Sequence, residues 1–300
     1  MAAITREEFL ANNNFGMILR TYATRKNDVS NRVAMIKKVV RATHNAFVDG
    51  KQLVKRIDIL VWTDKDFPES DCGETAATLQ KKFAKEKNVF ISEFPHGDIF
   101  CSILNGGVYR AGQNGIRYSI IISPEAYSYV TSEIFSDIVE AARDGALAIG
   151  VAIDELEDSV LDGRIANTFA VWNNQALASV GLFDLDAAKP FNEHVAHYLR
   201  GWDRESEENV YYHLAGVEEM IPLARLIDEY GPCVAPILPR GNGFRRYKAP
   251  DSRRHPYLYA KHIQKMETKL ERQTALLASI NVDISYLEGG VMSKYKKVHS

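Results

Sequence analysis

Short apolar runs alternate with helical patterns through the first half of the chain. Between the runs, apolar residues recur at three- and four-residue spacing, as in helices that bury one face. Strands that alternate with helices need crossover connections, and these build a mostly parallel sheet covered on both faces. One predicted helical face carries Ile36, Val39, Val40, Thr43 and Phe47. The pattern predicts strands over 15–19, 57–62, 89–91 and 118–122, and helices over 73–86, 98–112 and 131–144.

The rhythm changes after the apolar run at 146–152. We expect a strand over 168–172, followed by a short helix that Asn173 caps. A longer helix is predicted over 217–229, since Gly231 follows it as a typical terminator, and residues 233–238 form another strand.

A basic loop and one more helix complete the chain. The loop, RGNGFRRYKAPDSRRHPY from residue 240, carries six Lys or Arg residues and one acid. We predict a catalytic domain over 1–239, the basic flexible loop over 240–256 and a helical extension over 257–300. The extension has a coiled-coil-like seam of alternating four- and three-residue spacing. Its positions are Tyr259, Ile263, Met266, Leu270, Gln273, Leu277 and Ile280.

Composition narrows the class of protein. The 300 residues are 46% hydrophobic and 25% charged, which suffices for a large core. A net charge of −2 gives no reason to expect nucleic acid as a partner. Three scattered cysteines are typical of reduced cytosolic thiols. We find neither an apolar signal core at the N-terminus nor a transmembrane stretch, so we expect a cytoplasmic protein.

Four segments carry a resemblance to a known family. They are MILRTYATRKN (17–27), IDILVWTDKD (57–66), SILNGGVYRAGQNGIRYSIIISPEA (102–126), and the pair TFAVWNNQALASVGLFD (168–184) with AGVEEMIPLARLIDEYG (215–231). In this order they resemble the GT-A-fold glycosyltransferases, specifically the large inverting family 2. The resemblance implies a GT-A fold, a Rossmann-like and mostly parallel sheet flanked by helices, here with a C-terminal helical extension. It also implies transfer of a sugar from a nucleoside-diphosphate sugar, preferably a UDP-sugar, to an acceptor hydroxyl with inversion.

The same resemblance assigns roles to residues of this chain. Asp184 is implied to bind the acceptor, and Glu219, with Glu218 beside it, is implied to be the base that takes the acceptor proton. Ligands of open parallel sheets bind beyond the carboxyl ends of the strands, so we expect the nucleotide near Thr21, Asp64 and Ser123. The positions implied to bind the nucleotide sugar are Thr21, Tyr22, Asp64, Asn105, Gly107, Ser123 and Glu125.

The metal-binding motif departs from the family pattern. Where the family usually has Asp-any-Asp, this chain has Ser123, Pro124 and Glu125. Glu125 and His255 are the predicted ligands of a divalent cation, Mn²⁺ or Mg²⁺. Because one carboxylate is missing, we expect dependence on that cation to be weak or optional. Arg245 and Arg246 of the basic loop are a second source of positive charge for the diphosphate.

Each of these residues also has a structural explanation. Glu125 suits a helix start after proline, and Asp64 suits a turn after a strand. Glu218 and Glu219 are typical first-turn acids of a helix, and the basic loop is equally a solvated linker that makes His255 incidental. Two glycines within a helix, at 106 and 107, indicate close approach of either the donor or a packed strand.

Two further functions stay open at this point. A nucleotide-sugar-binding or assembly module without strong activity fits the incomplete metal motif. A sugar-nucleotide pyrophosphorylase shares the architecture, but ATRKND (23–28) has the cations of its phosphate loop without the glycines. We expect the C-terminal helix to form a homodimer or to pack on the catalytic domain, because exposed apolar stripes seldom stay unpaired.

Overall fold

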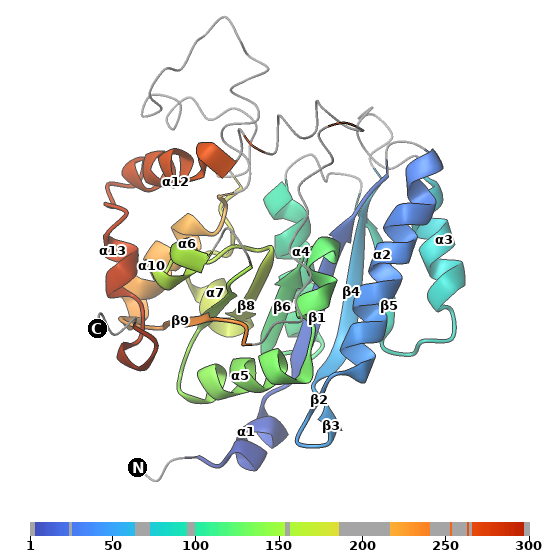
Figure 1. The fold of residues 1–300 in the computed structure, drawn as a ribbon, viewed down its shortest axis with the longest axis horizontal. Coiled ribbons are helices and arrows are strands. Elements are labelled where there is room, and N and C mark those ends of the chain that lie inside the picture. The colour runs from blue at the N-terminus through green and yellow to red at the C-terminus, as the bar shows by residue number, and fades with distance from the viewer. Residues whose placement is uncertain are drawn as a thin grey trace, which may run out of the picture.

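A seven-stranded sheet organises the chain (Figure 1). The computed structural model describes residues 4–23, 26–63, 73–94, 100–153, 157–185, 217–240 and 266–296, together with 253 and 263. The strands lie in the order β5-β4-β1-β6-β8-β7-β9. Their bounds are β1 Phe15–Thr21, β4 Val54–Trp62, β5 Val89–Phe94, β6 Tyr118–Ile122, β7 Ala148–Val151, β8 Phe169–Asn173 and β9 Val234–Ile237.

One strand runs against the others. β8 pairs antiparallel with β6 and with β7, whereas the remaining neighbours are parallel. The carboxyl ends of the six parallel strands therefore meet at one edge, and β8 begins there. A two-stranded ribbon of β2, Phe47–Val48, and β3, Lys51–Gln52, lies outside this sheet.

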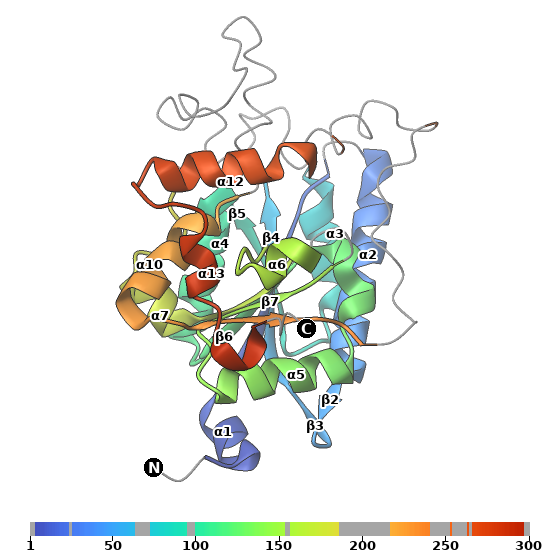
Figure 2. The ribbon, with the colours of Figure 1, turned by 60° about the vertical axis from the view of Figure 1, so that its left-hand side comes forward.

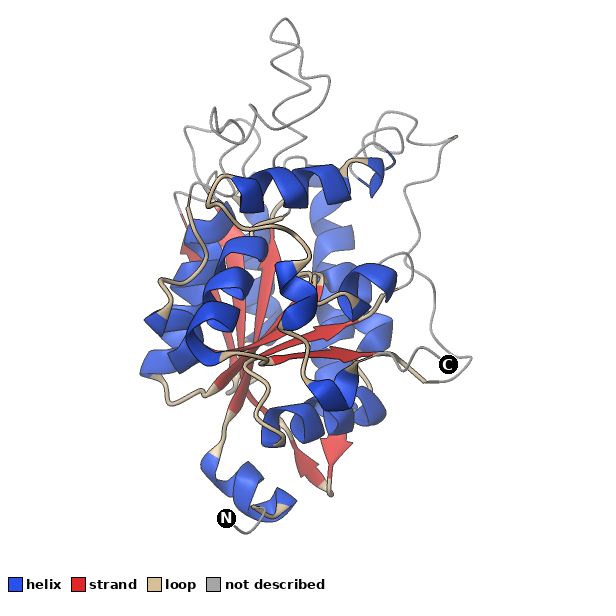
Figure 3. Cartoon of the chain, turned by 90° about the vertical axis from the view of Figure 1, so that its left-hand side faces the viewer, coloured by secondary structure: helices blue, strands red, loops and turns tan. Residues whose placement is uncertain are grey.

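Helices cover both faces of the sheet (Figure 3). One face buries Met17 and Leu19 of β1 with apolar residues of α2, α3 and α5, and the opposite face buries Ile18 with residues of α4, α7, α10, α12 and α13. The alternation along β1 follows from the two-residue period of a strand. The longer helices are α2 Lys26–Asn45, α3 Glu74–Phe83, α4 Phe100–Gln113, α5 Ser132–Arg143, α10 Met220–Tyr230 and α12 Lys269–Ala278. The shorter ones are α1 Arg6–Asn12, α6 Glu157–Leu161, α7 Asn174–Ser179, α13 Tyr286–Gly289 and the 3-10 helices η1 Pro124–Tyr129 and η4 Ser293–Tyr295.

This architecture confirms the predicted α/β class, a mostly parallel sheet flanked by helices with a C-terminal helical extension. Asn173 caps α7 as predicted, since its Oδ1 accepts a hydrogen bond of 3.1 Å from the amide of Ala176. Phe47 was placed wrongly. It lies beyond the end of α2, in β2, and is 48% exposed.

The C-terminal helix packs on its own domain. α12 buries a broad arc of residues against the domain, so the predicted narrow seam is wrong at Leu270, which is 52% exposed. Further along, Val291 forms a parallel bridge with Val234 of β9 and so continues the sheet. The buried residues of α12 are Arg272, Gln273, Ala275, Leu276 and Leu277. A homodimer through this helix stays a prediction.

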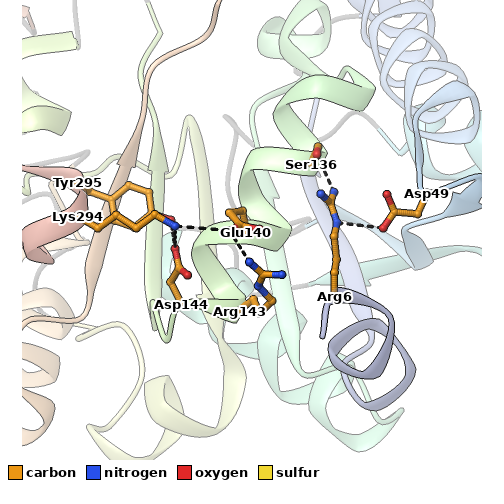
Figure 4. Close-up of polar contacts among 8 residues, drawn as sticks. All are labelled: Arg6, Asp49, Ser136, Glu140, Arg143, Asp144, Lys294 and Tyr295. Atoms are coloured by element: carbon orange, nitrogen blue, oxygen red, sulfur yellow. Dashed lines mark hydrogen bonds and ion pairs between the residues drawn. The ribbon is translucent and has the colours of Figure 1, made fainter. Parts of the chain in front are cut away.

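Helix α5 anchors both ends of the described chain (Figure 4). Arg6 of α1 donates a hydrogen bond of 2.6 Å to Ser136. At the other end of the helix, Lys294 and Tyr295 both bind Asp144, at 2.6 and 2.7 Å. None of the described helices is long and apolar enough to cross a bilayer.

Helix α4 packs on the sheet through Gly107. A Cβ at this position would lie 2.8 Å from Leu60 Cδ1 and 3.0 Å from Ile18 Cγ2, and both side chains are fully buried. The contact favours the packed strand over the donor as the reason for the glycine pair. It also places the start of α4 at the carboxyl edge.

Replacing Gly107 with alanine should therefore destabilise the fold. Gly112 of the same helix is the matched control, because a Cβ there would meet no atom within 4 Å. Both variants gain about 1 kcal/mol of helix propensity, and only Gly107→Ala adds overpacking of about 1–3 kcal/mol. We expect its free energy of unfolding in urea to be lower than that of Gly112→Ala by roughly this amount. Equal stability of the two variants would contradict the close packing.

Candidate active site

Thr21 and Ser123 lie on adjacent strands at the carboxyl edge. The register pairs Leu19 of β1 with Ile122 of β6, so Thr21 and Ser123 both lie just beyond this pair. Thr21 is buried, and its Oγ1 has no hydrogen-bond partner among the described residues. A buried hydroxyl without a partner is costly, and a ligand or water usually satisfies it.

An aromatic pair lies beside Thr21. The ring of Tyr22 meets that of Trp62, the last residue of β4, edge to face with 5.4 Å between centroids. Trp62 is buried and Tyr22 is partly exposed. The predicted nucleotide residues Thr21 and Tyr22 thus lie together with an aromatic side chain that sequence reasoning did not single out.

Glu125 is held by two neighbours in η1 and α2. Its Oε1 accepts a hydrogen bond of 3.1 Å from Arg32, and Ser123 Oγ donates to its Oε2. Each carboxylate oxygen keeps a second lone pair, so Glu125 still fits a cation that takes most of its ligands from phosphates and water. Within the described ranges, no group of three or more His, Cys, Asp or Glu residues could hold a metal ion.

Asn105 fixes the turn that carries Asp184. Its side chain donates to the carbonyl of Phe183 at 2.8 Å and accepts from the amide of Phe183 at 3.0 Å. Asp184 forms an ion pair of 3.5 Å with Arg225 of α10. Asn105 therefore positions the predicted acceptor residue, and these contacts do not direct its amide at a donor.

Two buried acids lie just before α10, with Glu219 at its N-cap position, so the interpretation as first-turn acids of this helix is wrong. Glu218 is 2% exposed and Glu219 is 4% exposed. An oxygen of Glu219 accepts a hydrogen bond from the backbone amide of Asn167, and Asn167 in turn accepts 2.9 Å from the indole of Trp172. Oε2 of Glu218 and Nδ2 of Asn167 are both buried without a hydrogen-bond partner in the described part of the chain. The pair and its neighbour thus leave one acceptor and one donor for a ligand or water.

Cations from distant parts of the sequence surround these acids. Arg20, at the carboxyl end of β1, interacts electrostatically with Glu218. Arg272 of α12 is 0% exposed and interacts with both acids. Burial lowers the pKa of Arg20, and it lowers the pKa of Arg272 to about 10 although the two acids oppose that shift. Figure 2 shows α12 lying across this end of the sheet.

The ionisation of Glu219 is strongly displaced. Burial, and then the charge of Glu218, raise its pKa to about 7, while Lys269 and backbone amides act in the opposite direction. Burial also raises the pKa of the nearby Cys101 thiol well above its ordinary range, which makes that thiol inert. A carboxyl group with a pKa near neutrality is typical of a group that exchanges protons during a reaction.

Six of the predicted site residues lie at the carboxyl edge of the sheet. Glu218 and Glu219 lie near Arg20 and Arg272, while Thr21, Tyr22, Ser123 and Glu125 lie at or just beyond the carboxyl ends of β1 and β6. Asp64, Arg245, Arg246 and His255 lie outside the described residues.

Sequence reasoning missed three arginines. Arg20 interrupts an apolar strand, which is an unusual position for a charge and was an available signal. Arg32 and Arg272 lie within ordinary amphipathic patterns, where an arginine is normally exposed. Only the tertiary structure brings Arg32 to Glu125 and Arg272 to the acid pair.

Comparisons with known proteins find matches among solved structures. No protein-family model and no curated protein sequence matches the chain. Among solved structures, glucosyl-3-phosphoglycerate synthase from Mycobacterium tuberculosis, in complex with Mn²⁺, UDP and phosphoglyceric acid, is 12% identical with a TM-score of 0.47, over 93% of this chain and 83% of that one. A mannosyltransferase from Pyrobaculum calidifontis, in complex with GDP-Man and Mn²⁺, is 11% identical with a TM-score of 0.42, over 91% and 77%.

A cytidylyltransferase from Leptospira borgpetersenii is 10% identical with a TM-score of 0.35, over 56% of this chain and 63% of that one.

The displaced pKa of Glu219 predicts how stability varies with pH. Between its ordinary value of 4.5 and about 7, the folded chain keeps a proton that the unfolded chain releases. Its contribution to stability is therefore complete below pH 4.5 and is lost as the pH rises through 7, by about 3 kcal/mol. Glu219→Gln removes this titration, so the variant should gain stability relative to the wild type between pH 4 and 8, measured by urea unfolding. Parallel curves for the two proteins would refute the shift.

Proposed function

We propose that this chain is a nucleotide-sugar-dependent glycosyltransferase that transfers a sugar to an acceptor hydroxyl with inversion. The observation that carries the proposal is the buried pair Glu218 and Glu219 at the carboxyl edge of the sheet, where Glu219 binds the amide of Asn167 and Glu218 interacts with Arg20. Thr168, which follows Asn167, accepts a hydrogen bond of 2.9 Å from the amide of Ser123. A base and a nucleotide-binding edge on one side of a sheet are what single-displacement sugar transfer requires. UDP is the favoured nucleotide, from the resemblance of the opening strands.

Glu219 is the proposed base. A general base works best when its pKa lies near the operating pH, because it is then ionised often enough and still holds the proton it receives. The pKa of about 7 meets this condition. Glu219 takes the proton of the acceptor hydroxyl as the oxygen attacks the anomeric carbon, and the bond to the diphosphate breaks on the opposite face. That geometry inverts the anomeric centre.

The departing diphosphate needs positive charge. Arg20 lies at the end of β1, next to Thr21, and the basic loop with Arg245 and Arg246 is the proposed further source. A divalent cation, when bound, would add charge neutralisation of the same kind, with Glu125 as its protein carboxylate. His255 is a further proposed ligand. Asp184, held by Asn105 and Arg225, is proposed to bind the acceptor.

Nucleotide binding should occur whether or not transfer does. Saturation with UDP at 100 times its dissociation constant should stabilise the fold by about 2.7 kcal/mol, seen as a higher melting temperature. Because Glu125 offers one carboxylate, Mn²⁺ should enhance the shift only when nucleotide is present, and EDTA should weaken binding without abolishing it. GDP, CDP and the corresponding sugars are the comparison set. A panel in which no nucleotide changes the melting temperature would overturn the nucleotide-sugar reading.

The role of Glu219 is tested by amide replacement. Glu219→Gln should lower the rate of transfer by ~10²- to 10⁴-fold while UDP affinity is kept, since the base is lost and the donor edge is untouched. Glu218→Gln is the adjacent control and should be milder at pH 8. Removing the charge of Glu218 should also lower the pKa of Glu219, so its activity should extend to lower pH than that of the wild type. Nucleotide binding with near-normal transfer in both variants would show that neither Glu218 nor Glu219 is the base. Binding without transfer in the wild type would favour the binding-module alternative.

A further inference from the structure

The carboxylate pair depends on charges that the C-terminal extension supplies. Lys269 and Arg272 are three residues apart in the first turn of α12, so they lie on one face of the helix. Arg272 is fully buried and Lys269 is partly buried. α12 packs on α10 next to the two acids, which places Lys269 within electrostatic range of Glu219 and Arg272 within range of both Glu218 and Glu219. A buried guanidinium of this kind persists only when it is paired.

Building on the proposed function, we propose that Lys269 and Arg272 are positioning residues of the active site, whose charges hold Glu219 in the ionised form that can accept the acceptor proton. Two adjacent carboxylates in an apolar environment repel one another, and burial favours their neutral forms. Cations beside them are what allow one of the two to act as a base. The helical extension thus contributes charged residues to the site in addition to packing over it.

Other elements also bring charged and titratable groups to the pair. β1 contributes Arg20, which interacts with Glu218, and α4 contributes Cys101, whose thiol stays neutral. Asp184 contributes a negative charge that interacts with Cys101. The loop before β8 contributes the amide of Asn167. Arg20 thus acts on Glu218 from the sheet, while Lys269 and Arg272 act on the pair from α12.

The anchoring of α12 supports this role. Gln273, beside Arg272, is fully buried, and its Oε1 accepts a hydrogen bond of 3.1 Å from Arg164. Arg164 is in turn paired with Asp162 at 2.7 Å. Within the helix, Nε of Arg272 donates to Thr268 at 3.3 Å. These contacts fix the register of α12 over the domain, so that its two cations keep their places over the acids.

The test uses variants that remove or keep each charge in the full chain. Lys269→Gln is the main variant, since a partly buried residue at a helix start tolerates the change. Arg272→Gln removes the buried charge, and Lys269→Arg and Arg272→Lys preserve charge. Lys294→Gln is the matched control. It removes a lysine of the same C-terminal segment whose partners, Asp144 and Glu140, belong to α5.

The first readout is independent of activity. In protein labelled with ¹³C at glutamate carboxyls, the Glu219 signal is the one missing from Glu219→Gln, and its titration gives the pKa directly. Lys269→Gln and Arg272→Gln should move this titration to higher pH, whereas the charge-preserving variants and Lys294→Gln should leave it at the wild-type value. An unchanged titration in Lys269→Gln, folded as judged by its spectrum, would overturn the proposal even if Arg272→Gln fails to fold.

The second readout is the pH profile of transfer. The acidic limb of kcat should move to higher pH in the charge-removing variants, with about tenfold less turnover below the limb for each unit of movement. The KM for the donor should stay the same, since the residues proposed to bind the donor belong to other elements than α12. A shifted titration without transfer in any variant would uphold the electrostatic role and reject the glycosyltransferase. A kcat limb that stays fixed while the titration moves would reject Glu219 as the base.

Discussion

The burial of two adjacent carboxylates is the constraint on which the rest of the site depends. Glu218 and Glu219 are almost completely removed from water, so their charges need partners that the chain must deliver from elsewhere. The partners come from positions as far apart in sequence as Arg20 and Arg272. The acid pair thereby ties the first strand of the sheet to the last long helix of the described chain.

Such an arrangement is expensive as a stabilising device. Replacing buried ion pairs by apolar residues of similar volume often leaves a protein as stable or more stable. A cluster of two acids and several cations is therefore best explained by proton chemistry, for which a group poised near neutrality is needed. The orphaned oxygen of Glu218 and the orphaned amide of Asn167 fit this explanation, because both lie where a ligand or water can complete them.

The sequence predicted the sheet well where one physical signal dominated. Apolar runs at 57–62 and 118–122 become β4 and β6, since fully buried strands are recognisable without knowledge of their neighbours. The seam of the last helix was harder to predict. Arg272 and Gln273 are polar and yet fully buried, so hydropathy alone could not find the face that packs. The predicted elements thus agree with the structure where the interactions that determine them lie close together in the sequence.

The same distinction applies to the site. Glu218 and Glu219 could be predicted from the sequence, because a pair of acids before a helix is a local pattern. Arg32 was not, since its pairing with Glu125 joins residues 93 positions apart. Asn105 illustrates a third case. The residue was noticed, but its amide is occupied by the backbone of Phe183, and only the folded chain shows that it supports a turn.

The reversed direction of β8 changes the chemical character of the sheet edge. At the carboxyl ends of parallel strands, the last backbone carbonyl groups lie together at one edge of the sheet. Their partial negative charges repel a carboxylate. β8 starts at that edge, so the chain enters it through Ala166 and Asn167 and brings an amide hydrogen among the carbonyls. Glu219 accepts a hydrogen bond from that amide. A single antiparallel strand thus gives the carboxyl edge of a mostly parallel sheet a backbone amide that can donate a hydrogen bond to an anion.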